Sequence, residues 1–204
     1  MTLTKEEIIK RLKSSNLSDR IVITPMLDAE DQLGTTGVDL RLGKQFIFFK
    51  DHLHGSLNPK ELREREGNLS SYQEEIVIPI RRKITLHPGQ FLVGSTLEYL
   101  AMPTDLEAQV EGRSSWARLG LLIATATTVH PNFKGVITLE LSNHGTIPLE
   151  LYPGMKIAQI IFHRTESPVS EGISKYKFSI GPSFSKIYQD QYIDYFCREE
   201  DQIS

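Results

Sequence analysis

The sequence predicts a mainly β protein, built as a sandwich, jelly roll or closed barrel with a few short helices. Many short segments alternate apolar and polar residues with a period of two, as half-buried strands do. Turns that contain glycine or proline separate these segments at intervals of about 8–12 residues. The 204 residues suit one domain over 1–204, in which residues from about 165 to 204 form a C-terminal tail.

The expected elements follow the chain in order. Thr4 and Glu7 form a capping-box pattern, which predicts a short amphipathic helix from about 5 to 13. Residues 50–72 are polar and predict a long surface excursion with room for one helical turn, and a weak helical patch lies around 189–197. Strands are expected over 21–24, 38–42, 45–49, 76–78, 84–86, 91–93, 106–110, 121–124, 136–141, 149–151 and 157–162.

One segment, 112–120, interrupts the β pattern. Serines open it, helix formers fill it, and Gly120 suits a helix C-terminus, so we expect one to two helical turns between two strands. The start of a helix beside Arg113 and two hydroxyl groups is a favourable seat for phosphate oxygens. Ser114 and Arg118 are four residues apart and share a helix face. The alternative is that Ser114 only caps the helix and Arg118 pairs with a surface acid.

Two strands carry contrasting patterns. In 136–142 a period of two directs Ile137, Leu139 and Leu141 to the core and leaves a polar opposite face with Glu140 as its single carboxylate. A solvated strand face has the same pattern, so Glu140 alone does not establish a site. The apolar run 121–124 predicts a buried strand.

His130 precedes a proline, and its loop would lie near Glu140 if the flanking strands form a hairpin.

Composition excludes several classes of protein. The net charge of −3 provides no basic surface for duplex nucleic acid. The single cysteine, Cys197, excludes an internal disulfide and the usual zinc-deaminase site, and it fits the reducing cytoplasm. The sequence holds no signal peptide and no apolar run long enough to cross a membrane. P-loop, dinucleotide-binding, nucleophile-elbow and zincin motifs are also absent.

Five segments in a fixed order make the chain resemble the dCTP deaminase branch of the dUTPase-like superfamily, from about residue 5 to 189. The block at 111–120 combined with the one ending in Glu140 is highly specific. The segments are Gly-Val-Asp-Leu-Arg-Leu-Gly at 37–43, His-Pro-Gly at 87–89, Glu-Gly-Arg-Ser-Ser-Trp-Ala-Arg-Leu-Gly at 111–120, Gly-Val-Ile-Thr-Leu-Glu at 135–140 and Pro-Gly-Met at 153–155.

The resemblance implies a dUTPase-like jelly-roll or distorted barrel that assembles as a homotrimer with active sites shared between subunits. It implies zinc-independent deamination of dCTP to dUTP and ammonia, which supplies dUTP for dUMP and dTMP synthesis. Mg2+ is expected as a cofactor that accompanies the triphosphate, and no metal-binding residues are expected in the protein itself. No nucleic-acid or membrane partner is expected.

The resemblance also implies residue roles. Glu140 transfers protons, and Ser114 and Arg118 hold the water and stabilise developing charge. A cation lowers the pKa of a neighbouring carboxylate, so burial must oppose Arg118 if Glu140 is to cycle. The expected substrate contacts, including a C-terminal lid over the nucleotide, are Arg113, Ser115, Trp116, Ala117, His130, Thr138, Leu139, Lys175, Tyr176 and Ser179.

Two positions depart from the family pattern and keep alternatives open. His130 stands where the family has an acid that contacts the deoxyribose and, in dUTPases, activates water. Ser179 replaces a glutamine of the lid. Loss of the acid argues against a dUTP diphosphatase or a bifunctional enzyme, and the presence of Glu140 argues for deamination. A non-catalytic nucleotide-binding regulator on the same fold is the second alternative.

Overall fold

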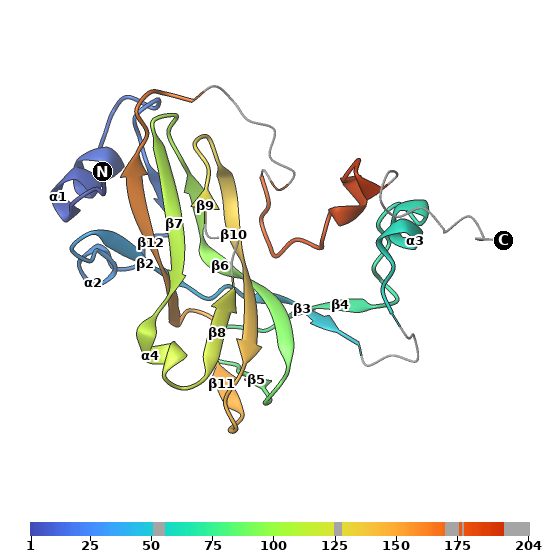
Figure 1. Ribbon diagram of the computed structural model, residues 1–204. Helices are drawn as coiled ribbons and strands as arrows, with labels where there is room; N and C mark the ends of the chain where they lie inside the picture. The colour runs from blue at the N-terminus through green and yellow to red at the C-terminus, as the bar shows by residue number, and fades with distance from the viewer. Residues whose placement is uncertain (51–55, 125–127, 170–175, 177, 194–204) are drawn as a thin grey trace.

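Two antiparallel β-sheets make up most of the protein in a computed structural model (Figure 1). The structure describes residues 1–50, 56–124, 128–169, 176 and 178–193. Short helices lie at the ends and edges of the sheets, so the mainly β prediction is confirmed. None of the helices in these ranges is long and apolar enough to cross a membrane.

The larger sheet has six strands, with β10 between β6 and β8. Its order is β4-β3-β6-β10-β8, and β1 pairs with β6 outside this path. The register pairs Glu140 of β10 with Val93 of β6 on one side and with Ala124 of β8 on the other. The bounds are β1 Val22–Thr24, β3 Gln45–Phe49, β4 Gln73–Val77, β6 Phe91–Ala101, β8 Leu121–Ala124 and β10 Lys134–Asn143.

The smaller sheet has four strands in the order β2-β12-β7-β9. Its strands are β2 Gly37–Arg41, β7 Leu106–Gly112, β9 Thr128–Val129 and β12 Lys156–Arg164. β5 (Ile84–Leu86) and β11 (Leu149–Leu151) form a separate pair. The chain therefore leaves the larger sheet after β8, pairs through β9 with β7, and returns to the larger sheet as β10.

The core lies between the two sheets. Leu139 and Leu141 of β10 are fully buried in it, while Thr138 and Glu140 are only half-buried, as the predicted alternation requires. From the smaller sheet, residues such as Ile160 and Phe162 of β12 are fully buried as well. Truncating one of these large side chains to alanine typically costs about 2–5 kcal/mol.

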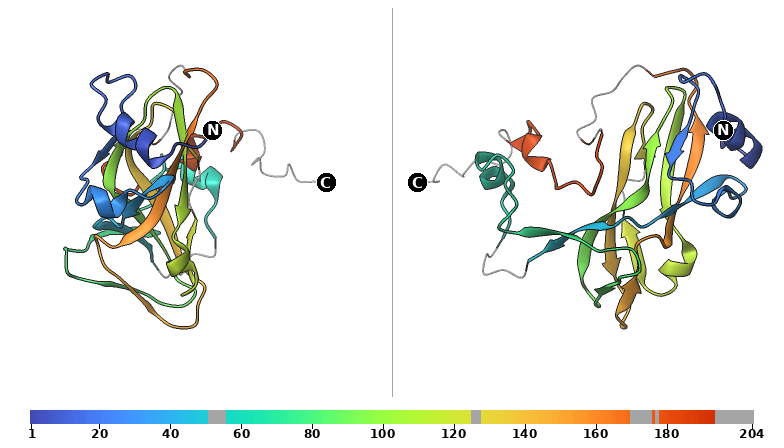
Figure 2. Two further views of the ribbon diagram at one scale, coloured as in Figure 1. Left: turned by 90° about the vertical axis from the view of Figure 1, so that its left-hand side faces the viewer. Right: turned by 180° about the vertical axis from the view of Figure 1, so that it is seen from behind.

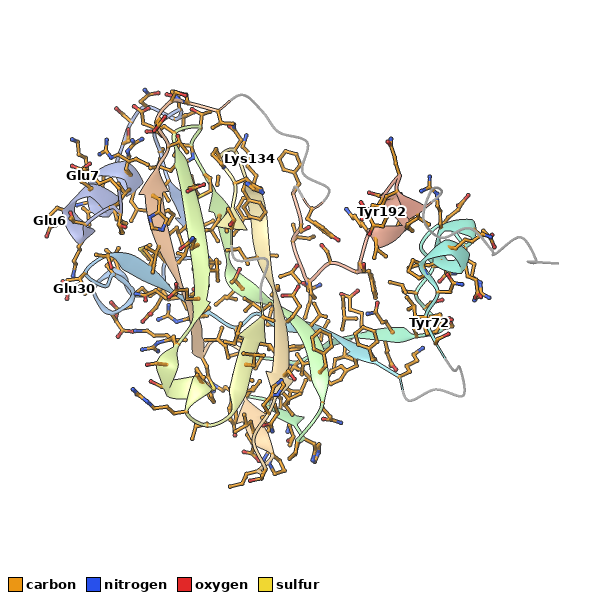
Figure 3. All side chains as sticks on the ribbon, viewed as in Figure 1. Glu6, Glu7, Glu30, Tyr72, Lys134 and Tyr192 are labelled. Carbon is orange, nitrogen blue, oxygen red and sulfur yellow. The ribbon has the colours of Figure 1, made fainter. Side chains whose placement is uncertain are left out.

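Two local predictions are corrected by the structure. The first helix, α1, spans Lys5–Leu12 as expected, but the Thr4 side chain makes no capping hydrogen bond, and Glu7 accepts one from Arg164 at 2.7 Å instead. Figure 3 labels Glu7 on α1. Within the predicted buried run, Leu122 is 51% exposed, because β8 is an edge strand and Leu122 alternates with the core-facing Leu121.

The remaining helices are short. α2 is Ala29–Gln32, and α4 (Ser114–Ala117) lies where the interruption of the β pattern predicted it. α3 (Pro59–Glu64) is the helical turn expected in the excursion 50–72. At the C-terminal helical patch, the described residues include the 3-10 turn η1 (Ile187–Gln189), and 194–197 lie outside the described residues. α3 and η1 lie together, away from the two sheets, as Figure 1 and the right-hand view of Figure 2 show.

Candidate active site

Glu140 lies near the middle of the larger sheet on the face turned away from the core. Its neighbours in sequence, Leu139 and Leu141, fill the core, so the alternation of β10 directs Glu140 outward. The residue is nevertheless half-buried, and burial raises the pKa of its carboxyl above the ordinary value of 4.5, opposed in part by a hydrogen bond from its own backbone.

One oxygen of the Glu140 carboxylate lacks a hydrogen-bond partner among the described residues. Its Oε2 atom is buried and makes no hydrogen bond to any described residue. A buried polar atom without a partner is costly, and such groups concentrate at functional sites. A half-buried carboxyl group with a raised pKa is suited to accept and return a proton near neutral pH.

The C-terminal segment lies along the same strand. The Ser179 carbonyl accepts a hydrogen bond from the Val136 amide at 2.9 Å, and the Ser183 amide donates to Thr138 Oγ1 at 3.4 Å. The Ser179 hydroxyl contacts Ser183 Oγ at 2.9 Å and donates to the Tyr176 carbonyl at 3.1 Å. These contacts bring Ser179 and Tyr176, two of the predicted lid residues, to the strand that carries Thr138 and Glu140.

Gly135 explains how the segment comes so close. A Cβ atom at this position would lie 3.2 Å from both the backbone nitrogen and the carbonyl oxygen of Ser179, so glycine leaves room for this close approach.

The third predicted lid residue, Lys175, lies outside the described residues.

The α4 turn is fixed to the smaller sheet through its first residues. Arg113 precedes the helix, and its amide donates to the Ile157 carbonyl of β12 at 3.2 Å. The Trp116 indole N–H donates to the Lys156 carbonyl at 2.9 Å, while its ring packs against the core. Gly120 ends the turn with φ +93°, where a Cβ atom would lie 2.5 Å from the backbone nitrogen of Gly145. Glycine at 120 is therefore required by both conformation and space.

The polar residues of α4 face solvent. Ser114, Ser115, Ala117 and Arg118 are exposed, and the Arg118 amide donates to the Ser114 carbonyl at 3.1 Å, so the two residues are one turn apart as predicted. Their side chains make no hydrogen bond or ion pair to any residue that the structure describes. Ser114 does not cap the helix. The N-cap residue is Arg113, and its side chain makes no capping hydrogen bond.

Two cations line a shallow depression beside α4. Its volume is about 420 Å³, and it is lined by Arg113, Ser115, Trp116, Leu119, Met155 and Lys156. Arg113 lies 3.6 Å from Asp39 and Lys156 lies 3.3 Å from the same carboxylate. Lys156 also binds Asp31 at 2.7 Å, and this contact is the main reason why the pKa of Asp31 is lowered.

Within one chain, Glu140 and α4 form two separate groups. No hydrogen bond or ion pair joins Glu140 to Ser114 or Arg118 among the described residues. His130 is exposed beside the turn before β10, because β9 pairs with β7 rather than forming a hairpin with β10. Figure 3 places Lys134 at the upper end of β10. Glu140 lies six residues further along this strand, a distance of roughly 20 Å along the strand axis.

The sequence did not single out Asp39 and Lys156 as site residues. Asp39 stands in one of the family-like segments, and Lys156 follows another. Only the strand pairing shows that Asp39 lies beside both Arg113 and Lys156. Leu139, predicted to line the substrate, has its side chain in the core. In the described ranges, no group of three or more His, Cys, Asp or Glu side chains is placed to hold a metal ion.

Comparisons with known proteins agree with this architecture. A model of the dCTP deaminase-like family matches residues 2–165. A dCTP deaminase of Haloarcula marismortui is 41% identical over 197 residues, which cover 94% of this chain and 97% of that protein. A protein of Dictyoglomus turgidum named "dCTP deaminase, dUMP-forming" is 39% identical over 208 residues, covering 99% of this chain and all of the relative.

A solved structure shows the same fold. The crystal structure of 2'-deoxycytidine 5'-triphosphate deaminase from Agrobacterium tumefaciens matches with a TM-score of 0.60 at 22% identity. The match covers 80% of this chain and 48% of that one, so the present chain spans about half the length of its structural relative.

Proposed function

Because the chain belongs to the dCTP deaminase-like family, we propose that it catalyses hydrolytic deamination of dCTP to dUTP and ammonia. The observation that supports this most directly is Glu140, a half-buried carboxylate with a raised pKa and one oxygen without a described partner. The reaction consumes one water, whose oxygen replaces the exocyclic amine at C4 of the cytosine.

Glu140 carries the protons in this proposal. Its carboxylate takes a proton from the water as the oxygen attacks C4, and returns it to N3 of the ring. A second transfer, from the new hydroxyl through Glu140 to the amine, releases ammonia and leaves the carbonyl of uracil. Burial suits Glu140 to this cycle because it raises the carboxyl pKa against the lowering effect of a nearby Arg118.

Ser114 and Arg118 complete the site from a neighbouring copy. They have no described partner in their own chain, and neither is joined to Glu140 there. We therefore place them against the Glu140 of a second subunit, where the hydroxyl orients the water and the guanidinium stabilises charge that develops on the ring. A homotrimer gives every chain both roles, as donor of Glu140 to one site and of α4 to the next.

The triphosphate belongs beside Arg113 and Ser115, since a guanidinium and a hydroxyl are suitable donors to phosphate oxygens. Mg2+ would accompany the triphosphate and offset part of its charge, while Arg113 and Ser115 would hold the phosphate oxygens. Thr138 and the backbone of Leu139 lie along the base and sugar, since the Leu139 side chain is in the core. His130 contacts the deoxyribose, and Trp116 and Ala117 shape the site from α4. The chain acts as one catalytic domain over 1–204, with residues from about 165 onward, including Lys175, Tyr176 and Ser179, as a lid.

A second candidate is a bifunctional enzyme that also cleaves dUTP to dUMP and pyrophosphate. The relative from Dictyoglomus turgidum is named as dUMP-forming, which favours it. Against it, His130 stands where a carboxylate would activate water for diphosphate cleavage.

The single cysteine suits a reducing cytoplasm, where we place the reaction.

The deciding experiment incubates the protein with dCTP and with dUTP in separate reactions and measures ammonia and pyrophosphate. Ammonia from dCTP without pyrophosphate supports the deaminase. Both products support the bifunctional enzyme. Binding of either nucleotide without any product refutes both and favours a regulator. For a Glu140→Gln variant in this assay, Glu150→Gln is the matched control. It removes a strand carboxylate that pairs with Lys83 and lies outside the site.

A further inference from the structure

We propose that Asp39 is a positioning residue that aims the Arg113 guanidinium at the triphosphate. This inference rests on the proposed function of Arg113 as a phosphate ligand. The relevant contact joins two strands of the smaller sheet: Asp39 lies on β2, and Arg113 directly follows β7, with β12 between them.

The contact engages the side of the guanidinium rather than its end. Asp39 Oδ1 lies 3.6 Å from Arg113 Nε. The two terminal nitrogens of Arg113, which form the fork that matches phosphate oxygens, have no described partner. The Asp39 carboxylate beside Nε therefore restricts rotation of the Arg113 side chain. It leaves the two terminal nitrogens of Arg113 available for the ligand.

Asp39 itself is held in place by two further contacts. Its Oδ2 lies 3.3 Å from Lys156 Nζ, and that amine is fixed by Asp31 at 2.7 Å. The Asp39 carbonyl accepts a hydrogen bond from Gln32 Nε2 at 3.1 Å. The side chain is only 16% exposed, so it is less screened by water than an ordinary surface carboxylate.

The backbone of the α4 turn does not depend on this carboxylate. The Arg113 amide is bonded to Ile157, and the Trp116 indole is bonded to the Lys156 carbonyl. Removing the charge of Asp39 should therefore change where the Arg113 side chain points while α4 stays in place. If the ion pair between Asp39 and Arg113 were purely structural, its loss would affect stability and leave ligand affinity unchanged.

The test measures the affinity of Asp39→Asn for dCTP and for inorganic tripolyphosphate by calorimetry, together with KM and kcat for dCTP. We expect affinity for both ligands to fall about tenfold, since a charge-assisted bond to phosphate is misaligned rather than lost. KM rises by a similar factor and kcat stays within about twofold. Asp39→Glu keeps the charge, folds under the same constraints, and recovers part of the affinity.

Two further variants make the result decisive. Asp105→Asn breaks another partly buried ion pair, between Asp105 and Arg11, and should leave tripolyphosphate binding unchanged. In an Arg113→Ala background, Asp39→Asn should have no further effect. Wild-type affinity in Asp39→Asn, or an equal loss without Arg113, overturns the proposal. If the wild type releases no ammonia but Asp39→Asn still weakens tripolyphosphate binding, the proposed reaction fails and the positioning role stands.

Discussion

Glu140 and the α4 turn contain the two halves of the proposed site, and the fold holds them in opposite ways. Glu140 lies on β10, which is paired on both sides; the residue is half-buried, and one of its carboxylate oxygens has no hydrogen-bond partner among the described residues. Ser114 and Arg118 are exposed on a single helical turn, which is attached to the smaller sheet through Arg113 and Trp116. Burial in the sheet raises the pKa of Glu140, whereas in the proposed site α4 supplies Ser114 and Arg118, which act against another subunit.

The largest effect is expected from Glu140→Gln, which removes the proton carrier but retains its shape. Deamination should fall at least about 10³-fold, because general acid–base transfer is lost. Affinity for dCTP should stay close to that of the wild type. Ammonia release and calorimetry measure the two quantities. Unchanged turnover would remove Glu140 from the mechanism.

Arg118→Ala tests whether the second half of the site comes from another chain. Alone, it should lower kcat about 100-fold, as loss of a preorganised charge does. Mixing it with Glu140→Gln after joint refolding should restore about a quarter of the wild-type sites, since a site pairs one chain's carboxylate with the next chain's guanidinium.

The same mixture has a clear negative outcome. If each site lies within one chain, no activity returns on mixing. Light scattering of the wild type should give a trimer, and a monomer at the assay concentration would contradict shared sites.

A smaller effect is expected from Arg113→Ala, which removes a binding group rather than a reacting one. KM for dCTP should rise about 10–100-fold, because one charge-assisted contact to phosphate is lost, with a modest change in kcat. Deoxycytidine, which has no phosphate, should bind both proteins equally. Equal dCTP affinity of the variant and the wild type would place the triphosphate elsewhere.

The smallest effect concerns stability. Because burial raises the pKa of Glu140, the folded chain retains a proton that the unfolded chain has released, in the pH range above the ordinary value of 4.5. The contribution of Glu140 to stability therefore decreases as pH rises through this range. Glu140→Gln should melt at a higher temperature than the wild type at pH 8, and this difference should vanish near pH 4. A constant difference across pH would exclude the titration as its cause.

Local patterns predicted the parts of the site that depend on one segment. The alternation of 136–142 identified which side of β10 faces the core, and the serines and Gly120 identified α4. Long-range pairing could not be predicted in this way. The contact of Asp39 with Arg113 requires β12 to lie between β2 and β7, and the exposure of Leu122 requires β8 to be an edge strand. Both follow from strand order, which a period of two does not encode.

The contact between Gly120 and the turn after β10 has a consequence for communication between active centres. The His144 amide donates to the Gly120 carbonyl at 2.8 Å, which joins the end of α4 to the end of the strand that carries Glu140. In the proposed trimer these two ends serve different centres. In that assembly, a nucleotide bound at α4 of one centre would be linked through this hydrogen bond to the strand that carries the carboxylate of the next.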